Sequence, residues 1–190
     1  MASLAEPQRL DARRNRQAVL DSAVELLSEG PEASMQQIAE ASGLGRTTVY
    51  RHFPNREDLL RALFEQLVQE AEGITGRVIE EGGSAEQILR RLAPEMIAVG
   101  LRYRFLNAYR ELGRAAMQEG KEDEGDPVGL YLVAAQGRGD IRPDVPIQWM
   151  MSLVQALSVA AMDDLYAGHF DQATVSGLLG DSLVAALIPD

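Results

Sequence analysis

Six hydrogen-bonding residues stand close together between a glycine and a proline, Gly43 and Pro54. Arginine can form two parallel hydrogen bonds with guanine, and threonine offers a methyl group to thymine or a hydroxyl to phosphate. Tyrosine and histidine reach phosphate oxygens, which fixes register without reading the base sequence. These residue types fit contacts with double-stranded nucleic acid. The six residues are Arg46, Thr47, Thr48, Tyr50, Arg51 and His52.

The spacing of the same segment predicts a short helix with one apolar side. At about 100° per residue, Val49 and Phe53 fall together, while the polar side chains spread over the remaining surface. A helix is also predicted just before it, because Ser34 and Gln37 form a capping-box pattern. Gly43 allows the tight turn between the two helices. This layout is a helix-turn-helix, whose second helix enters the major groove of DNA.

Helical periodicity continues through almost the whole chain, and strand-like alternation is absent. The sequence predicts an all-α fold with a three-helix helix-turn-helix domain at 1–54, disordered over 1–7, and a helical ligand-binding and dimerisation domain at 55–190. The helices are predicted over 15–30, 34–42, 47–53, 56–79, 84–99, 102–118, 127–136, 146–166 and 171–187.

Composition excludes several classes of site. The chain of 190 residues has no cysteine and only two histidines, so disulfides, thiolate chemistry and a histidine-based metal site are not expected. No phosphate loop or nucleophile elbow is present, and the adjacent Asp163 and Asp164 would point about 100° apart on a helix. We therefore expect no catalytic residue, no metal and no cofactor. The N-terminus lacks the apolar core of a signal peptide, which favours a cytoplasmic protein without a membrane partner.

The net charge of −11 is unevenly distributed. Residues 1–64 carry eight arginines against nine Asp and Glu, so this third is nearly neutral and can hold a locally basic face. The acidic remainder is explained by a well-solvated surface. A cationic ligand paired with Glu95, Glu111 or Asp163 is the alternative.

The helix predicted over 146–166 is apolar on every side. Such a helix must be covered all round, so one side can pack on the chain's own core while another meets a second copy. The helix after it keeps i, i+3, i+4, i+7 spacing. We expect a homodimer interface here, with two purely internal helices as the alternative. The predicted interface residues are Met151, Val154, Leu157, Met162, Val175, Leu178, Leu179, Leu183 and Leu187.

Two segments resemble a known family. Residues 34–60 read SMQQIAEASGLGRTTVYRHFPNREDLL, and residues 139–145 read GDIRPDV. The first closely resembles the DNA-binding domain of TetR/AcrR-type bacterial repressors, and the second resembles a segment that often precedes their dimerisation helices. The resemblance implies DNA contacts by Ser34, Gln36, Arg46, Thr47, Thr48, Tyr50, Arg51, His52 and Arg56.

Roles within this set follow the same resemblance. Arg46 stands where the family often reaches a base edge, and Tyr50 and His52 stand where it usually clasps the DNA backbone. Arg56 matches a position that commonly touches phosphate. Residue-level alternatives remain open: Ser34 can serve as a helix cap, and Tyr50 can pack beside the first helix.

The function implied is a dimeric, ligand-responsive repressor that leaves a palindromic double-stranded DNA operator when a small-molecule effector binds. An activator, or a helical adaptor that binds protein, is the alternative with the same fold. The effector, the operator sequence and the regulated genes are not predictable. Candidates for the ligand pocket are Met96, Tyr103, Met117, Tyr131 and Met150, although methionines are more often core residues.

Overall fold

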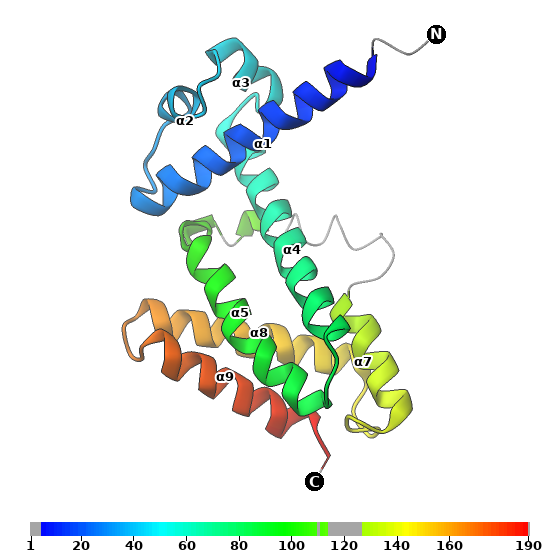
Figure 1. Ribbon diagram of the computed structural model, residues 1–190. Coiled ribbons are helices and arrows are strands. Elements are labelled where there is room, and N and C mark those ends of the chain that lie inside the picture. The colour runs from blue at the N-terminus through cyan, green and yellow to red at the C-terminus, as the bar shows by residue number, and fades with distance from the viewer. Residues whose placement is uncertain (1–4, 110, 114–126, 190) are drawn as a thin grey trace. The chain divides into compact units, whose positions relative to one another are not determined.

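The computed structural model describes residues 5–109, 111–113 and 127–189 (Figure 1). Within these ranges the chain is helical and contains no strand, which confirms the predicted all-α fold. No helix in the described ranges combines the length and the apolar character needed to cross a bilayer.

Two compact units make up the chain. One comprises residues 1–67 with 102–121, and the other comprises residues 68–101 with 122–190. The division falls within the long helix α4 (Arg56–Glu80), so α4 contributes to both units. The functional boundary that the sequence predicts just before α4 stays a prediction.

The first unit is a small helical head in which three helices contact one another in pairs. Its core is built from apolar residues that recur at helical spacing on each element. A short 3-10 helix, η1, also contacts the first helix. The elements are α1 (Ala5–Glu29), α2 (Met35–Ala41), α3 (Arg46–His52), the start of α4, and η1 (Arg104–Tyr109). The buried core includes Val19, Ala23, Leu27, Ile38, Val49, Phe53, Leu59 and Leu63.

Local capping explains where the helices of the head begin. The Ser34 hydroxyl accepts a hydrogen bond from the Gln37 amide at 3.3 Å, and the Gln37 side chain accepts from the Ser34 amide at 2.8 Å, which confirms the predicted capping box. Gly43 adopts a φ of 68°, the left-handed conformation that glycine reaches without strain. The Asn55 side chain accepts from the Asp58 amide at 2.9 Å and caps α4.

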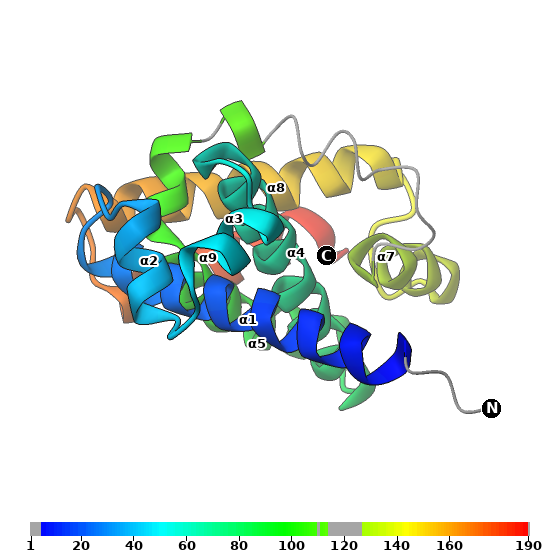
Figure 2. The same cartoon turned by 90° about the horizontal axis from the view of Figure 1, so that it is seen from above.

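The described residues of the second unit form the rest of α4 and four further helices, two of which, α8 and α9, pack extensively on each other (Figures 1 and 2). Helix α8 also contacts α5, because the Tyr166 hydroxyl donates to the Gly100 carbonyl at 2.7 Å. The Met162 sulfur would lie only 2.6 Å from a Cβ at Gly100, so the glycine permits this close approach. The helices are α5 (Ala85–Arg102), α7 (Pro127–Arg138), α8 (Ile147–Tyr166) and α9 (Gln172–Leu187).

Several element boundaries differ from those predicted, among them that of α5, which ends at Arg102 and so runs past the predicted end at residue 99. Helix α1 begins at Ala5, so residues 5–7 are helical and not disordered, while residues 1–4 lie outside the described ranges. Within the helix predicted over 102–118, residues 104–109 form η1 and residues 111–113 are helical, while residues 110 and 114–118 lie outside the described ranges. The Leu106 amide donates to the Tyr103 carbonyl at 2.9 Å, the i, i+3 bond of a 3-10 turn. Helix α7 continues past the predicted end, and Gly139, with a φ of 79°, terminates it.

Candidate nucleic-acid interface

Helix α3 has two distinct sides, as the helical periodicity predicts. Val49 and Phe53 are buried, at 0% and 2% exposure. The opposite surface is exposed, and Tyr50 keeps 44% of its surface accessible. The helix is therefore held by apolar residues and carries its hydrogen-bonding groups toward solvent. The exposed members of the predicted set are Arg46, Thr47, Tyr50 and Arg51, with Thr48 and His52 half-buried.

A cation from the first helix also holds α3 in place. The Arg16 guanidinium lies 5.4 Å from the centroid of the Phe53 ring, within the range of a cation–π interaction. Arg16 also pairs with Glu65 of α4 at 3.5 Å. Arg16 therefore helps to hold Phe53, the residue that follows α3, in its buried position. The neighbouring Arg13 and Arg14 are exposed.

His52 is partly withdrawn from solvent. Its Nε2 is buried and has no hydrogen-bond partner among the described residues. Burial lowers the pKa of His52, and the nearby charges of Arg51 and Arg16 lower it further. A contact between His52 and phosphate would therefore use the other ring nitrogen, on a neutral imidazole.

The two predicted contact residues at the start of α2 have different surroundings. Ser34 is exposed but uses its hydroxyl in the capping box with Gln37. Gln36 is also exposed, and its amide donates to the Glu40 carboxylate at 2.9 Å. Ser34 therefore acts as the helix cap, while Gln36 stays available to a ligand on the surface.

Arg56 is held inside the first unit. Its guanidinium donates to the carbonyl of Ala33 and, at 2.7 Å, to the carbonyl of Pro31, and it lies 3.5 Å from the Tyr109 hydroxyl. These bonds tie the start of α4 to the loop between α1 and α2. The phosphate contact predicted for Arg56 would have to compete with them.

An Arg56→Lys variant separates a structural role from phosphate binding. Lysine keeps the charge but cannot reproduce the planar fork that reaches two carbonyls. We expect the α2 and α3 amides to lose about 2 kcal/mol of protection in hydrogen exchange, because hydrogen bonds to a charged donor are lost. An Arg56→Met variant should show the same loss. If Lys retained full protection, or restored a DNA affinity that Met had lost, phosphate binding would be its main role.

A cavity of about 80 Å³ lies in the second unit, among residues of α4, α5, α7, α8 and α9. Of the predicted pocket residues, Met96 and Tyr131 line it. Met150 is fully buried but is not among its lining residues, and Tyr103 is buried in the first unit, where its hydroxyl accepts from Gln66 at 3.1 Å. Met117 lies outside the described residues.

The residues of the predicted dimer interface differ in their exposure, and the interface itself stays a prediction. Four of its residues on α9 are buried, because this side of the helix packs toward α5 and α8: Val175, Leu179, Leu183 and Leu187. Met162 on α8 packs over Gly100. Met151, Val154 and Leu157 are half-buried, and Leu178 is 49% exposed.

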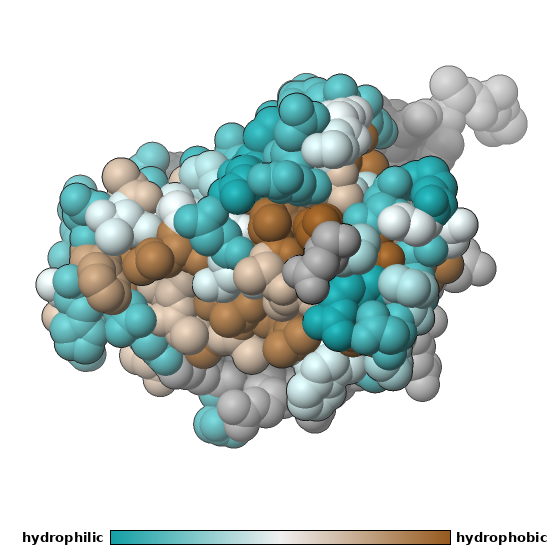
Figure 3. All heavy atoms as spheres, turned by 90° about the horizontal axis from the view of Figure 1, so that it is seen from below, coloured by the Kyte–Doolittle hydropathy of each residue, from teal (hydrophilic) through white to brown (hydrophobic). Residues whose placement is uncertain are grey.

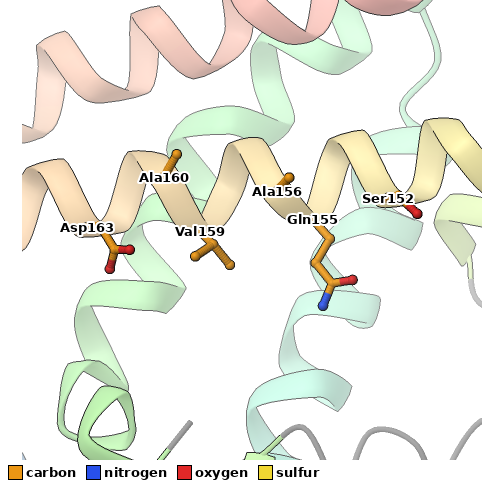
Figure 4. A pocket seen from close by; sticks show the side chains of 6 residues that line it. All are labelled: Ser152, Gln155, Ala156, Val159, Ala160 and Asp163. Atoms are coloured by element: carbon orange, nitrogen blue, oxygen red, sulfur yellow. The ribbon is translucent and has the colours of Figure 1, made fainter.

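A stripe of exposed residues on α8 was not predicted. It follows i, i+3, i+4 spacing, so its side chains project from one side of the helix and line a shallow hollow (Figure 4). Most of them are small, and Val159 is the largest apolar member, at 47% exposure. The same spacing is visible in the sequence, but apolar residues on every side of α8 concealed it. The stripe residues are Ser152, Gln155, Ala156, Val159, Ala160 and Asp163.

Sequence comparison relates the head to known regulators. The family described as bacterial regulatory proteins of the tetR family matches residues 19–63, which contain α2, α3 and the start of α4. The HTH-type transcriptional repressor LfrR of Mycolicibacterium smegmatis is 37% identical over 87 residues. That match spans 46% of this chain and 46% of the repressor, so the chain aligns with less than half of this curated relative.

Solved structures extend the similarity to both units. The TetR-like regulator LfrR from Mycobacterium smegmatis, crystallised with proflavine, is 26% identical and covers 94% of this chain and 98% of its own, with a TM-score of 0.64. A TetR-family regulator from Rhodococcus sp. has a TM-score of 0.75 at 19% identity, over 90% and 97% of the two chains, and shows the same fold. The head therefore matches the tetR family of bacterial regulatory proteins, and the chain has the fold of TetR-like transcriptional regulators.

Proposed function

We propose that the chain represses transcription by binding an operator as a homodimer, with α3 of each protomer in a major groove. The observation that carries this proposal is the two-sided α3, whose Val49 and Phe53 are buried while Arg46 and Tyr50 are exposed. The similarity to LfrR, itself a repressor, supports repression over activation. A two-fold dimer would read two half-sites about one helical turn, or a small multiple, apart.

The contact residues divide between base reading and phosphate binding. Arg46 and Arg51 are exposed and carry charge, so they are suited to base edges and to phosphate. Tyr50 exposes its ring and can direct its hydroxyl to a phosphate oxygen. Thr47 and Gln36 are also exposed, and Thr48 is half-buried.

Arg46→Ala and Tyr50→Phe variants test this division on an operator selected from a random DNA pool. We expect Arg46→Ala to weaken binding by about 1–3 kcal/mol and to relax specificity at one base position. Tyr50→Phe should weaken binding to all sequences similarly, because only a phosphate contact is lost. Fluorescence anisotropy over a salt series measures both effects.

Arg77→Ala is the control, since Arg77 is an exposed arginine of the second unit. It should leave operator affinity and salt dependence unchanged. If Arg46→Ala and Tyr50→Phe behaved like this control, α3 would not be the reading helix. A selected pool without palindromes would argue against a two-fold dimer.

The homodimer is proposed to form through the exposed α8 stripe and the Leu178 side of α9. Small residues on the stripe allow a second helix to approach closely, and Val159 and Leu178 supply apolar surface. Figure 3 shows brown and tan residues gathered on one face of the molecule, with hydrophilic residues toward its edges. A second copy is the occupant because a two-fold interface is self-complementary, and identical helices can pack along one stripe.

Effector response is assigned to the cavity of the second unit. Thr75 and Ile79, which line this cavity, lie on α4, and α4 also carries Leu59 and Leu63 in the core of the head. A ligand that fits only one arrangement of α4 would shift the population of DNA-binding conformations. The structure of LfrR in complex with proflavine supports a small molecule as the ligand.

A further inference from the structure

The cavity of the second unit has a distinctive chemistry. Its described lining consists of apolar side chains and three hydroxyl-bearing residues, Thr75, Tyr131 and Ser158. No charged side chain belongs to this described lining. The exposed carboxylates of Glu95 and Asp163 are also absent from it. An ammonium or carboxylate group entering the cavity would lose its hydration without gaining an opposite charge, which is strongly unfavourable.

Tyr131 contributes a polar group to this cavity. Its side chain is buried, and its hydroxyl has no hydrogen-bond partner among the described residues. A buried hydroxyl without a partner costs free energy, so a group that satisfied it would bind more tightly than an apolar one. Burial raises the pKa of Tyr131, so the phenol stays protonated and can donate a hydrogen bond at neutral pH.

We infer that the effector is an uncharged, mainly apolar molecule with one hydrogen-bond acceptor, such as a carbonyl oxygen, placed against the Tyr131 hydroxyl. This inference rests on the proposed function, because it names the ligand class of the same regulatory cavity. The cavity would contribute apolar contacts, while Tyr131 would select the acceptor.

Cavity size sets the scale of the ligand. At about 80 Å³ the cavity is smaller than the roughly 150 Å³ apolar cavity that holds benzene in another protein. A ring-sized ligand therefore requires the cavity to widen. Met96 lines it and can change rotamer readily, because its side chain is unbranched and flexible. Such widening would change the position of α4 when a ligand binds, because Thr75 and Ile79 of this helix line the cavity.

The test uses three six-membered ring probes of similar size. Cyclohexanone has the acceptor, methylenecyclohexane lacks it, and cyclohexylammonium carries a positive charge. Titration calorimetry on the full chain should show that cyclohexanone binds about five- to tenfold more weakly to Tyr131→Phe than to wild type, the effect of one hydrogen bond. Methylenecyclohexane should bind both proteins equally, and cyclohexylammonium should not bind.

Tyr103→Phe is the matched control, since Tyr103 lies in the first unit. It should leave cyclohexanone binding unchanged. Tyr131→Phe should remain folded, because it removes only an unpartnered hydroxyl, and its melting temperature checks this.

Three outcomes would overturn the inference: equal cyclohexanone affinity for wild type and Tyr131→Phe, tighter binding of cyclohexylammonium, or no binding of either neutral probe. Operator binding by the wild-type chain is measured separately. If the wild-type chain bound no operator, the proposed regulatory function would be wrong. The probe results bear only on the chemistry of the cavity.

Discussion

Replacing Val159 with arginine is expected to dissociate the dimer and to weaken operator binding roughly a hundredfold or more. Val159 is the largest apolar residue of the exposed α8 stripe. A two-fold interface receives every substitution twice, so two arginines would be brought close together and stripped of water. Analytical ultracentrifugation would show monomers, and operator titration would show the loss of affinity.

Leu130→Arg provides the matched control. Leu130 lies on α7, is 62% exposed, and gains the same charge outside the proposed interface. Its dimer and its operator affinity should match those of wild type. A Val159→Arg protein that sedimented as a wild-type dimer would exclude the α8 stripe from the interface.

Features that depend on neighbouring residues could be read from the sequence. The capping box at Ser34 involves residues three apart, and it is present. The two sides of α3 were predicted for the same reason, because Val49 and Phe53 are one turn apart on a single helix.

Features that depend on distant residues could not be read in this way. The fork of Arg56 reaches the Pro31 carbonyl, 25 residues away, and the sequence carries no sign of this pairing. Helix α9 is rich in apolar residues, so periodicity alone did not distinguish the buried Leu179 from the exposed Leu178. The cavity brings Thr75, Tyr131 and other lining residues together from five helices, which only the tertiary fold can do.

A further large effect, on the stability of the head, is expected from replacing the buried Phe53 at the end of α3. The buried and exposed sides of this helix can be tested separately. Phe53→Ala should reduce the stability of the head by about 3–5 kcal/mol, because a fully buried aromatic ring is lost and a cavity remains. The ring also supports the Arg16 guanidinium, 5.4 Å from its centroid. Hydrogen exchange of the α2 and α3 amides measures this local stability.

Tyr50→Ala is the matched substitution on the other side of α3. It removes an aromatic ring of similar size that is 44% exposed, so it should change stability by less than about 0.5 kcal/mol. Its operator affinity should nevertheless fall, because the proposed phosphate contact is lost. Both variants should therefore bind DNA weakly, but for different reasons. Phe53→Ala loses the packing that holds α3 in place, whereas Tyr50→Ala loses only a contact with DNA. If Tyr50→Ala destabilised the head as strongly as Phe53→Ala, Tyr50 would be part of the core, and α3 would not present a polar side to DNA.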